Sequence, residues 1–180
     1  LLDIDDELAL ETNAILHDKE FKQLEASWRG LRYLIDQTDE ADPRIEVRVL
    51  DTTKAKLIED LGSGEGIKDS QLYRMVFSNT LDVQGADPFG VLIGDFEFGY
   101  QSQDVDLLDK LGEMGKYIGL PFVSAAAPSL LGLTEFTQLA KYKEGQLVKH
   151  LGASSNYTRW NSFREQDHAR YVALVMPHFM

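Results

Sequence analysis

Cysteine is absent from the sequence, and histidine is scarce. Without cysteine the chain can form neither a disulfide framework nor a thiolate metal site, which fits a cytoplasmic protein. The four histidines, His17, His150, His168 and His178, do not have a ligand spacing such as H-E-x-x-H. The histidines therefore do not support a zinc site, and we assign no metal ligand and no bound cofactor.

Positive charge is also in short supply, because 18 Lys and Arg stand against 30 Asp and Glu, for a formal net charge of −12. Phosphate binding needs clustered basic side chains, so this balance argues against a nucleic acid partner. The longest uncharged run, residues 117–134, is interrupted by Pro121, Pro128 and several glycines. We interpret it as a buried strand and turn rather than a membrane span, and no signal peptide is visible.

The centre of the sequence holds two short apolar segments with an amphipathic one between them. Residues 89–94 and 121–128 are nearly unbroken apolar runs, and the segment between them places Val105, Leu108 and Leu111 on one helical face. Strands of this kind are expected in a parallel sheet covered on both faces, and a strand–helix–strand order makes a right-handed crossover. We predict an α/β fold with a mostly parallel sheet and flanking helices, ending in a strand at residues 171–176.

The first 40 residues are predicted to be helical. A first helix contains Ile4, Leu8 and Ile15. A second, from about Lys19 to Asp36, has apolar residues at the a and d positions of a heptad repeat: Phe21, Leu24, Trp28, Leu31 and Ile35. The heptads are too few to favour a coiled coil. We therefore interpret residues 1–40 as a helical segment that packs on the core, and residues 41–180 as one α/β body domain.

Residues 45–49 alternate between apolar and charged side chains. This pattern predicts a strand with one wet face or a strand at a sheet edge. Thr52 and Thr53 can cap a short helix that follows.

Asp95 and Glu97 are the strongest candidates for chemistry. They follow a predicted strand at the edge where open α/β sheets bind ligands, and they would share a side if the strand continued. A metal site or an acid–base pair is one interpretation. We favour the other, in which Asp95 caps a turn and Glu97 pairs with an arginine, because position in a fold is only an analogy.

Other catalytic motifs are not found. The chain has no G-x-S-x-G motif, and we interpret Ser124 and Ser129 as packing or turn residues. The glycines at 62–66 follow a helix and precede no Lys-Ser/Thr pair, so they do not predict a nucleotide-binding loop. Trp160 and Arg164 stand four residues apart, which suits either a cation–π pair or an interface anchor, and the sequence does not choose between them.

Five segments, in this order, resemble one protein family. They are residues 24–31 (LEASWRGL), 88–98 (PFGVLIGDFEF), 121–130 (PFVSAAAPSL), 160–164 (WNSFR) and 170–174 (RYVAL), the last followed by Pro177. Over nearly the whole chain they resemble the large subunit of the bacterial type VI secretion contractile sheath, the TssC/VipB family. Two positions depart from the pattern: Phe96, where a tyrosine is common, and Leu131, where a phenylalanine is common.

The resemblance implies a structural subunit and not an enzyme. Such subunits pair with a small sheath subunit, and the heterodimers stack with copies of themselves around a tube of inner tube protein. Contraction drives the tube out of the cell, and a hexameric AAA+ ATPase dismantles the contracted sheath. The resemblance implies no catalytic, cofactor-binding or metal residue. It marks the following motif positions as structural or interface residues: Glu25, Trp28, Arg29, Asp95, Glu97, Trp160, Phe163, Arg164 and Arg170.

Family members are longer than this chain, so the resemblance implies a fragment of a larger sheath subunit, truncated at both ends. A start at Leu1 and an apolar tail at residues 175–180 agree with that expectation. We expect that the fragment does not form sheath by itself. Two alternatives remain open: a sheath protein of a related phage-tail-like contractile particle, and a small α/β ligand- or metal-binding enzyme domain that uses Asp95 and Glu97.

Overall fold

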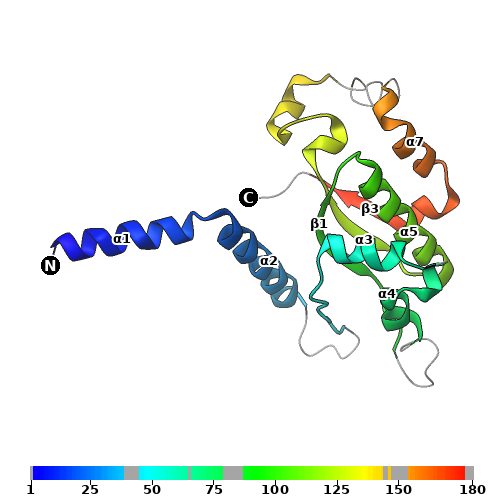
Figure 1. Ribbon diagram of the computed structural model, residues 1–180, viewed down its shortest axis with the longest axis horizontal. Helices are drawn as coiled ribbons and strands as arrows, with labels where there is room; N and C mark the ends of the chain where they lie inside the picture. Colours follow the sequence, from blue (N-terminus) through cyan, green and yellow to red (C-terminus); the bar gives the residue numbers. More distant parts are fainter. Residues whose placement is uncertain are drawn as a thin grey trace. The chain divides into compact units, whose positions relative to one another are not determined.

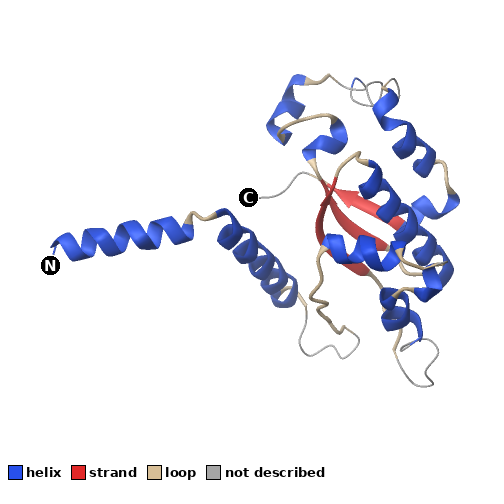
Figure 2. Ribbon diagram, viewed as in Figure 1, coloured by secondary structure: helices blue, strands red, loops and turns tan. Residues whose placement is uncertain are grey.

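The computed structural model describes residues 2–38, 45–64, 66–78, 87–143, 146 and 154–176. The chain divides into two compact units, Leu1–Asp51 and Thr52–Met180, and each is described here by itself. Figure 1 labels the helices and strands, and Figure 2 separates helix, strand and loop by colour. No described helix is both long enough and apolar enough to cross a membrane.

The first unit contains two helices, α1 (Leu2–Leu16) and α2 (Lys19–Asp36). Helix α2 has the bounds that its apolar repeat predicts. It begins there because the Asp18 carboxylate accepts the backbone N–H groups of Glu20 and Phe21, at 2.9 and 3.1 Å. A carboxylate at this position satisfies N–H groups that have no partner inside the helix.

The apolar stripe of α2 is uncovered, since no residue of the helix is buried. The packing of residues 1–40 on the core therefore stays a prediction. The strand predicted at residues 45–49 is wrong for the described structure, in which residues 45–50 belong to no strand. Alternation alone does not make a strand, because a strand needs a neighbour to complete its hydrogen-bond ladder.

The second unit is built on a three-stranded parallel sheet with the order β1 (Leu92–Phe98), β2 (Phe122–Ala126), β3 (Val172–Val175). Helix α5 (Ser102–Ile118) connects β1 to β2 and ends at Gly119, whose φ of 75° is in the left-handed region that glycine accepts most readily. The α/β class, the parallel sheet and the strand–helix–strand centre are thus confirmed.

Helices cover one face of this sheet. Helix α5 packs on the sheet together with α3 (Lys54–Gly62), and the short α4 (Gln71–Tyr73) lies against α3 (Figure 1). Helix α3 begins as predicted, with the Thr53 side chain accepting the N–H of Lys56 at 3.3 Å. The largest fully buried side chains of this core are Phe98, Val105, Leu108, Leu111 and Met114.

The other face of the sheet is open within this unit. Strand register places Ile93, Val123 and Ala173 side by side on it, and Ile93 is 62% exposed. Within this unit the helices therefore cover one face only, and the prediction of a sheet covered on both faces stays a prediction. Apolar runs in the sequence show that residues are apolar on both sides of a strand, but they do not show which partner covers each side.

A long connection leads from β2 to β3. It contains the 3₁₀ helices η3 (Pro128–Leu131), η4 (Phe136–Lys141), η5 (Ser155–Tyr157) and η6 (Asp167–Tyr171), and helix α7 (Thr158–Arg164). Between α3 and β1 lie η1 (Ile67–Asp69) and the π-helical turn η2 (Arg74–Ser78). We call residues 155–171 the strap, because they contact α5 on the way to β3.

Candidate functional site

A bulge in β1 shapes the sheet around the candidate acidic residues. Ile93 pairs with Val123, whereas Glu97 pairs with Ala125, so β1 has two more residues than β2 between these pairs. The Ser124 hydroxyl lies 2.8 Å from the Gly94 carbonyl oxygen and 2.7 Å from that of Phe96. It therefore donates its one proton to carbonyl groups that the bulge removes from the regular ladder.

This arrangement gives Ser124 a structural role. Its side chain is 2% exposed, and its recorded partners are backbone carbonyl groups, which accept hydrogen bonds and cannot act as a general base. The interpretation of Ser124 as a packing residue agrees with this geometry. Gly94 is needed in the same bulge because a Cβ atom there would lie 2.7 Å from the Phe122 ring.

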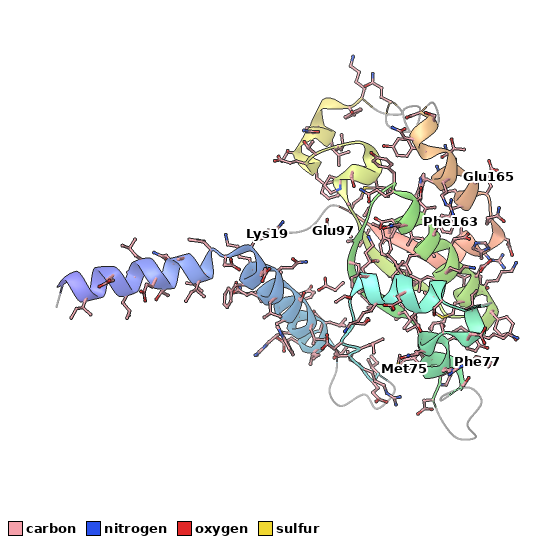
Figure 3. All side chains as sticks on the ribbon, in the orientation of Figure 1. Lys19, Met75, Phe77, Glu97, Phe163 and Glu165 are labelled. Carbon is pink, nitrogen blue, oxygen red and sulfur yellow. The ribbon has the colours of Figure 1, made fainter. Side chains whose placement is uncertain are left out.

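Asp95 and Glu97 are both exposed residues of β1, and Glu97 is labelled in Figure 3. They share a side of the strand, as their spacing predicts. They do not follow the strand, however, because β1 begins at Leu92 and continues to Phe98. They therefore lie on the open face within β1, with Glu97 next to the last residue of the strand, rather than in the loop beyond it. Within the described residues, no group of three or more acidic or histidine side chains could hold a metal ion.

The carboxyl end of β1 is occupied by an ion pair of the chain itself. Lys54 Nζ, from the first residue of α3, lies 2.6 Å from Asp104 Oδ1 in the first turn of α5. Lys54 also donates to the Glu97 carbonyl oxygen at 2.7 Å, and its Nζ lies 4.5 Å from the centre of the Phe98 ring. The other oxygen of Asp104 accepts the Gly99 N–H at 2.7 Å.

These contacts join α3, β1 and α5 at the carboxyl end of the strand, where open α/β sheets often bind a ligand. Both side chains are largely buried, with 25% of Lys54 and 14% of Asp104 exposed. No sequence pattern indicates Lys54. The residue stands 43 positions before Glu97, whose carbonyl it binds, and no local motif connects the two.

The strap is held on α5 by two ion pairs and by one contact between a histidine and a carboxylate. Arg159 pairs with Asp106, His168 Nε2 lies 2.7 Å from Asp109 Oδ1, and Lys116 Nζ lies 2.8 Å from Asp167 Oδ2. The hydrogen bond from Lys116, followed by the charge of Arg170, lowers the pKa of the Asp167 carboxyl group. Attraction to a nearby cation favours the charged carboxylate, which is why the pKa falls.

Four motif residues lie in or beside the strap. Phe163, labelled in Figure 3, is 5% exposed and belongs to the core. The half-buried Trp160 has its ring centre 5.8 Å from that of Phe163. Arg164 is exposed, and among the described residues the recorded ring contact of Trp160 is with Phe163 and not with Arg164. Arg170 is exposed, 3.3 Å from Asp167 and 5.3 Å from the Tyr171 ring centre.

The other three motif residues lie on α2. Arg29 and Glu25 form an exposed ion pair at 2.6 Å, one helical turn apart. Trp28, between them in sequence, is 63% exposed. A tryptophan that packs only in the core of its own domain is usually much less exposed than this.

The ion pairs at the end of β1 and along the strap thus join elements of the chain to one another. Comparison with known proteins agrees with such a structural role. Residues 1–180 match the family model described as EvpB/VC_A0108, tail sheath N-terminal domain (VipB). The chain belongs to this family. The resemblance found in the sequence is therefore confirmed, and this VipB tail sheath family is one of structural proteins.

A curated relative of this VipB family member is the type VI secretion system sheath protein TssC1 of Pseudomonas aeruginosa PAO1. The two are 31% identical over 179 residues, which is 98% of this chain. The chain spans about a third (35%) of the length of that relative. This coverage agrees with a fragment of a larger subunit.

Proposed function

We propose that this chain is part of the body of the large sheath subunit of a type VI secretion system. The match of residues 1–180 to the tail sheath N-terminal domain is the observation that carries the proposal. The name of the Pseudomonas relative, a sheath protein of that system, supports it.

The proposed partners follow the family. The subunit assembles with a small sheath subunit, and with copies of itself, around an inner tube in the cytoplasm. Contraction of this assembly propels the tube out of the cell, and an AAA+ ATPase disassembles the contracted sheath. Energy is stored in the extended arrangement and released when subunits dock again in a second arrangement.

Two features of the chain support a role in assembly. The apolar stripe of α2 and the open face of the sheet both carry exposed large apolar side chains, among them Trp28 at 63% and Ile93 at 62%. Contiguous exposed apolar surface is a mark of protein contact sites.

Co-expression tests the proposal. The whole subunit that contains this chain is produced together with the small subunit encoded beside it, and the product is viewed by negative-stain electron microscopy. We expect long hollow tubules, and we expect none from residues 1–180 alone. The proposal would be overturned if the whole subunit were soluble and did not assemble with the small subunit. Divalent metal binding that is lost in Asp95→Asn would instead favour the enzyme-domain alternative.

A further inference from the structure

The open face of the sheet is an apolar surface with small side chains along its centre. On the middle strand β2 it presents Val123 and Ala125, both half-buried. The two outer strands contribute Ile93 and Val175, which are 62% and 58% exposed. A surface of this kind is stabilised when a second apolar layer covers it, and small central side chains leave room for large ones from that layer.

The size of this face matches one helix. Three strands about 4.8 Å apart span about 10 Å, which is close to the width of a helix with its side chains, about 10–12 Å. The 18 residues of α2 extend about 27 Å, and the seven residues of β1 extend about 23 Å. A single helix of the length of α2 can therefore cover the whole face.

Helix α2 has the apolar side that such a cover needs. Its apolar stripe consists of the a and d residues Phe21, Leu24, Trp28, Leu31 and Ile35. Leu31 is half-buried, and the other four are 37–63% exposed. Two of the five are aromatic, so the stripe has the large side chains that fit against a sheet surface made of valine and alanine.

The charges beside the two surfaces are complementary. Asp95 and Glu97 border the open face on β1, about 6.6 Å apart along the strand. Arg29 and Arg32 border the stripe, about 4.5 Å apart along the helix, and 79% of each side chain is accessible. Each arginine already pairs with a carboxylate of α2, but exposed pairs contribute little, and a guanidinium group has enough N–H donors to bind a second carboxylate.

Charge also favours α2 over the other helix of the first unit. Helix α1 exposes apolar side chains as well, such as Ile4 at 63% and Leu8 at 64%. Its sequence, LDIDDELALETNAIL, has five Asp and Glu and no Lys or Arg. On the open face it would bring carboxylates toward Asp95 and Glu97, and like charges in contact disfavour that arrangement.

A contact between two different surfaces of one chain can repeat without end. When a helix of one copy covers the sheet of a second, the first copy still has its own sheet face and the second still has its own helix. Head-to-tail contacts of this type build rings or helical assemblies, whereas a contact between identical surfaces stops at two copies. Both surfaces are exposed in the described chain, so both are available to other copies.

We propose that α2 of one copy of this chain packs on the open sheet face of the next copy. Trp28 then lies over Val123 and Ala125, and the Arg29–Arg32 edge of the helix faces the Asp95–Glu97 edge of the sheet. The inference rests on the proposed function, because a sheath stacks many copies in one direction. A contact of this size is weak between two isolated chains and gains strength when many copies are held together.

Sedimentation velocity of residues 1–180 over a wide concentration range tests the contact. We expect reversible association that continues beyond the dimer as concentration rises. Trp28→Ala removes the centre of the helix surface, and Ile93→Asp places a charge on the sheet surface, so each variant alone should stay monomeric. An equimolar mixture of the two should form dimers and nothing larger, because each variant retains one working surface.

Charge reversal tests which edges meet. Arg32→Glu or Glu97→Arg should weaken association by about tenfold, and an equimolar mixture of these two variants should associate again, since each contact then joins opposite charges. Mixing cannot repair a loss of folding, so recovery reports contact between chains. Lys19→Glu and Glu113→Arg are the matched controls. Lys19, labelled in Figure 3, is at an f position on the outer side of α2, and Glu113 belongs to α5, which covers the other face of the sheet.

Three outcomes overturn the inference: a wild-type chain that stays monomeric at the highest concentration, a mixture of Trp28→Ala and Ile93→Asp that does not stop at dimers or does not form them, or a charge-reversed mixture that does not recover. In the first case the predicted packing of residues 1–40 on the core of their own chain is the better interpretation of the stripe. The sheath proposal is judged separately, because tubules from the whole subunit can form whether or not this contact exists.

Discussion

The ammonium group of Lys54 lies 2.6 Å from the carboxylate of Asp104, at the end of β1. The pair connects the first residue of α3 to the first turn of α5, and each partner also binds the backbone of the segment between them. In this sheath family member the place where many α/β sheets hold a ligand is thus used to fasten the chain to itself.

Removal of one partner from the Lys54–Asp104 pair should destabilise the folded protein. We expect Lys54→Met to lower the free energy of unfolding by about 1–3 kcal/mol, because Asp104 would keep its charge in a largely buried place. Urea denaturation at pH 7 measures the change. Lys110→Met is the control, since Lys110 and Glu113 are 3.5 Å apart with 44% and 39% exposed. Equal losses in the two variants would contradict this role for Lys54.

Ser124→Ala tests the bulge of β1. The substitution removes the donor shared by the Gly94 and Phe96 carbonyl groups, and we expect a loss of about 1–3 kcal/mol in the free energy of unfolding. Hydrogen exchange at residues 94–97 should accelerate as well, since the bulge is no longer held. Ser162→Ala in α7 changes an exposed serine and should have little effect. A stable Ser124→Ala protein with unchanged exchange would show that the hydroxyl is dispensable.

Two glycines of the second unit should respond oppositely to alanine. A Cβ atom at Gly115 would lie 2.6 Å from the Leu120 carbonyl oxygen and 2.9 Å from Tyr171 Cβ, so Gly115→Ala should destabilise the fold by about 1–3 kcal/mol. Gly62 has no atom within 4 Å of its Cβ position, and Gly62→Ala should be neutral or slightly stabilising. Thermal unfolding of both variants measures this difference. If Gly115→Ala unfolds at the same temperature as the wild-type protein, the turn after α5 can move away from the added methyl group.

Tyr157 should make stability depend on pH in the alkaline range. Burial, followed by the nearby Tyr100 and Tyr142, raises the pKa of its phenol above the ordinary value of 10.0. The folded state therefore holds the proton more tightly than the unfolded state. The stabilisation is fully present below about pH 10 and is lost as pH rises through the folded pKa.

Urea denaturation between pH 8 and pH 11 checks the direction of this effect. Tyr157→Phe should lose stability less steeply with rising pH than the wild-type protein, because it has no phenol to ionise. Tyr33→Phe serves as the control, since that ring is 68% exposed. If Tyr157→Phe and the wild-type protein lose stability in parallel, Tyr157 is not the group responsible.

The elements that sequence predicts well are those whose signals are local. Helix α2 was found with its bounds, because its apolar repeat lies in one stretch of chain. The strand β1 was placed too early, ending at Gly94, because its last pairs depend on β2. Glu97 and Phe98 join the sheet only by pairing with Ala125 and Ala126.

The candidate site shows the same limit. The spacing of Asp95 and Glu97 predicted a shared side correctly, but their place within β1 follows from a bulge that Ser124 contacts and that no local motif predicts. Lys54 was missed because its partners are distant in sequence. The strand predicted at residues 45–49 was wrong for a related reason. Alternation of apolar and charged residues indicates which side of a strand would be buried, but it does not provide a neighbouring strand to pair with.

The close approach of the strap to α5 has a mechanical consequence. At Gly112 and Gly115 a Cβ atom would meet the His168 carbonyl oxygen at 3.0 Å and Tyr171 Cβ at 2.9 Å, so almost no space separates the two segments. Side chains can rotate under load, whereas backbone in direct contact has no such freedom. A force applied to β3 should therefore be transmitted to α5 with little deformation, so that β3, the strap and α5 move as one rigid piece.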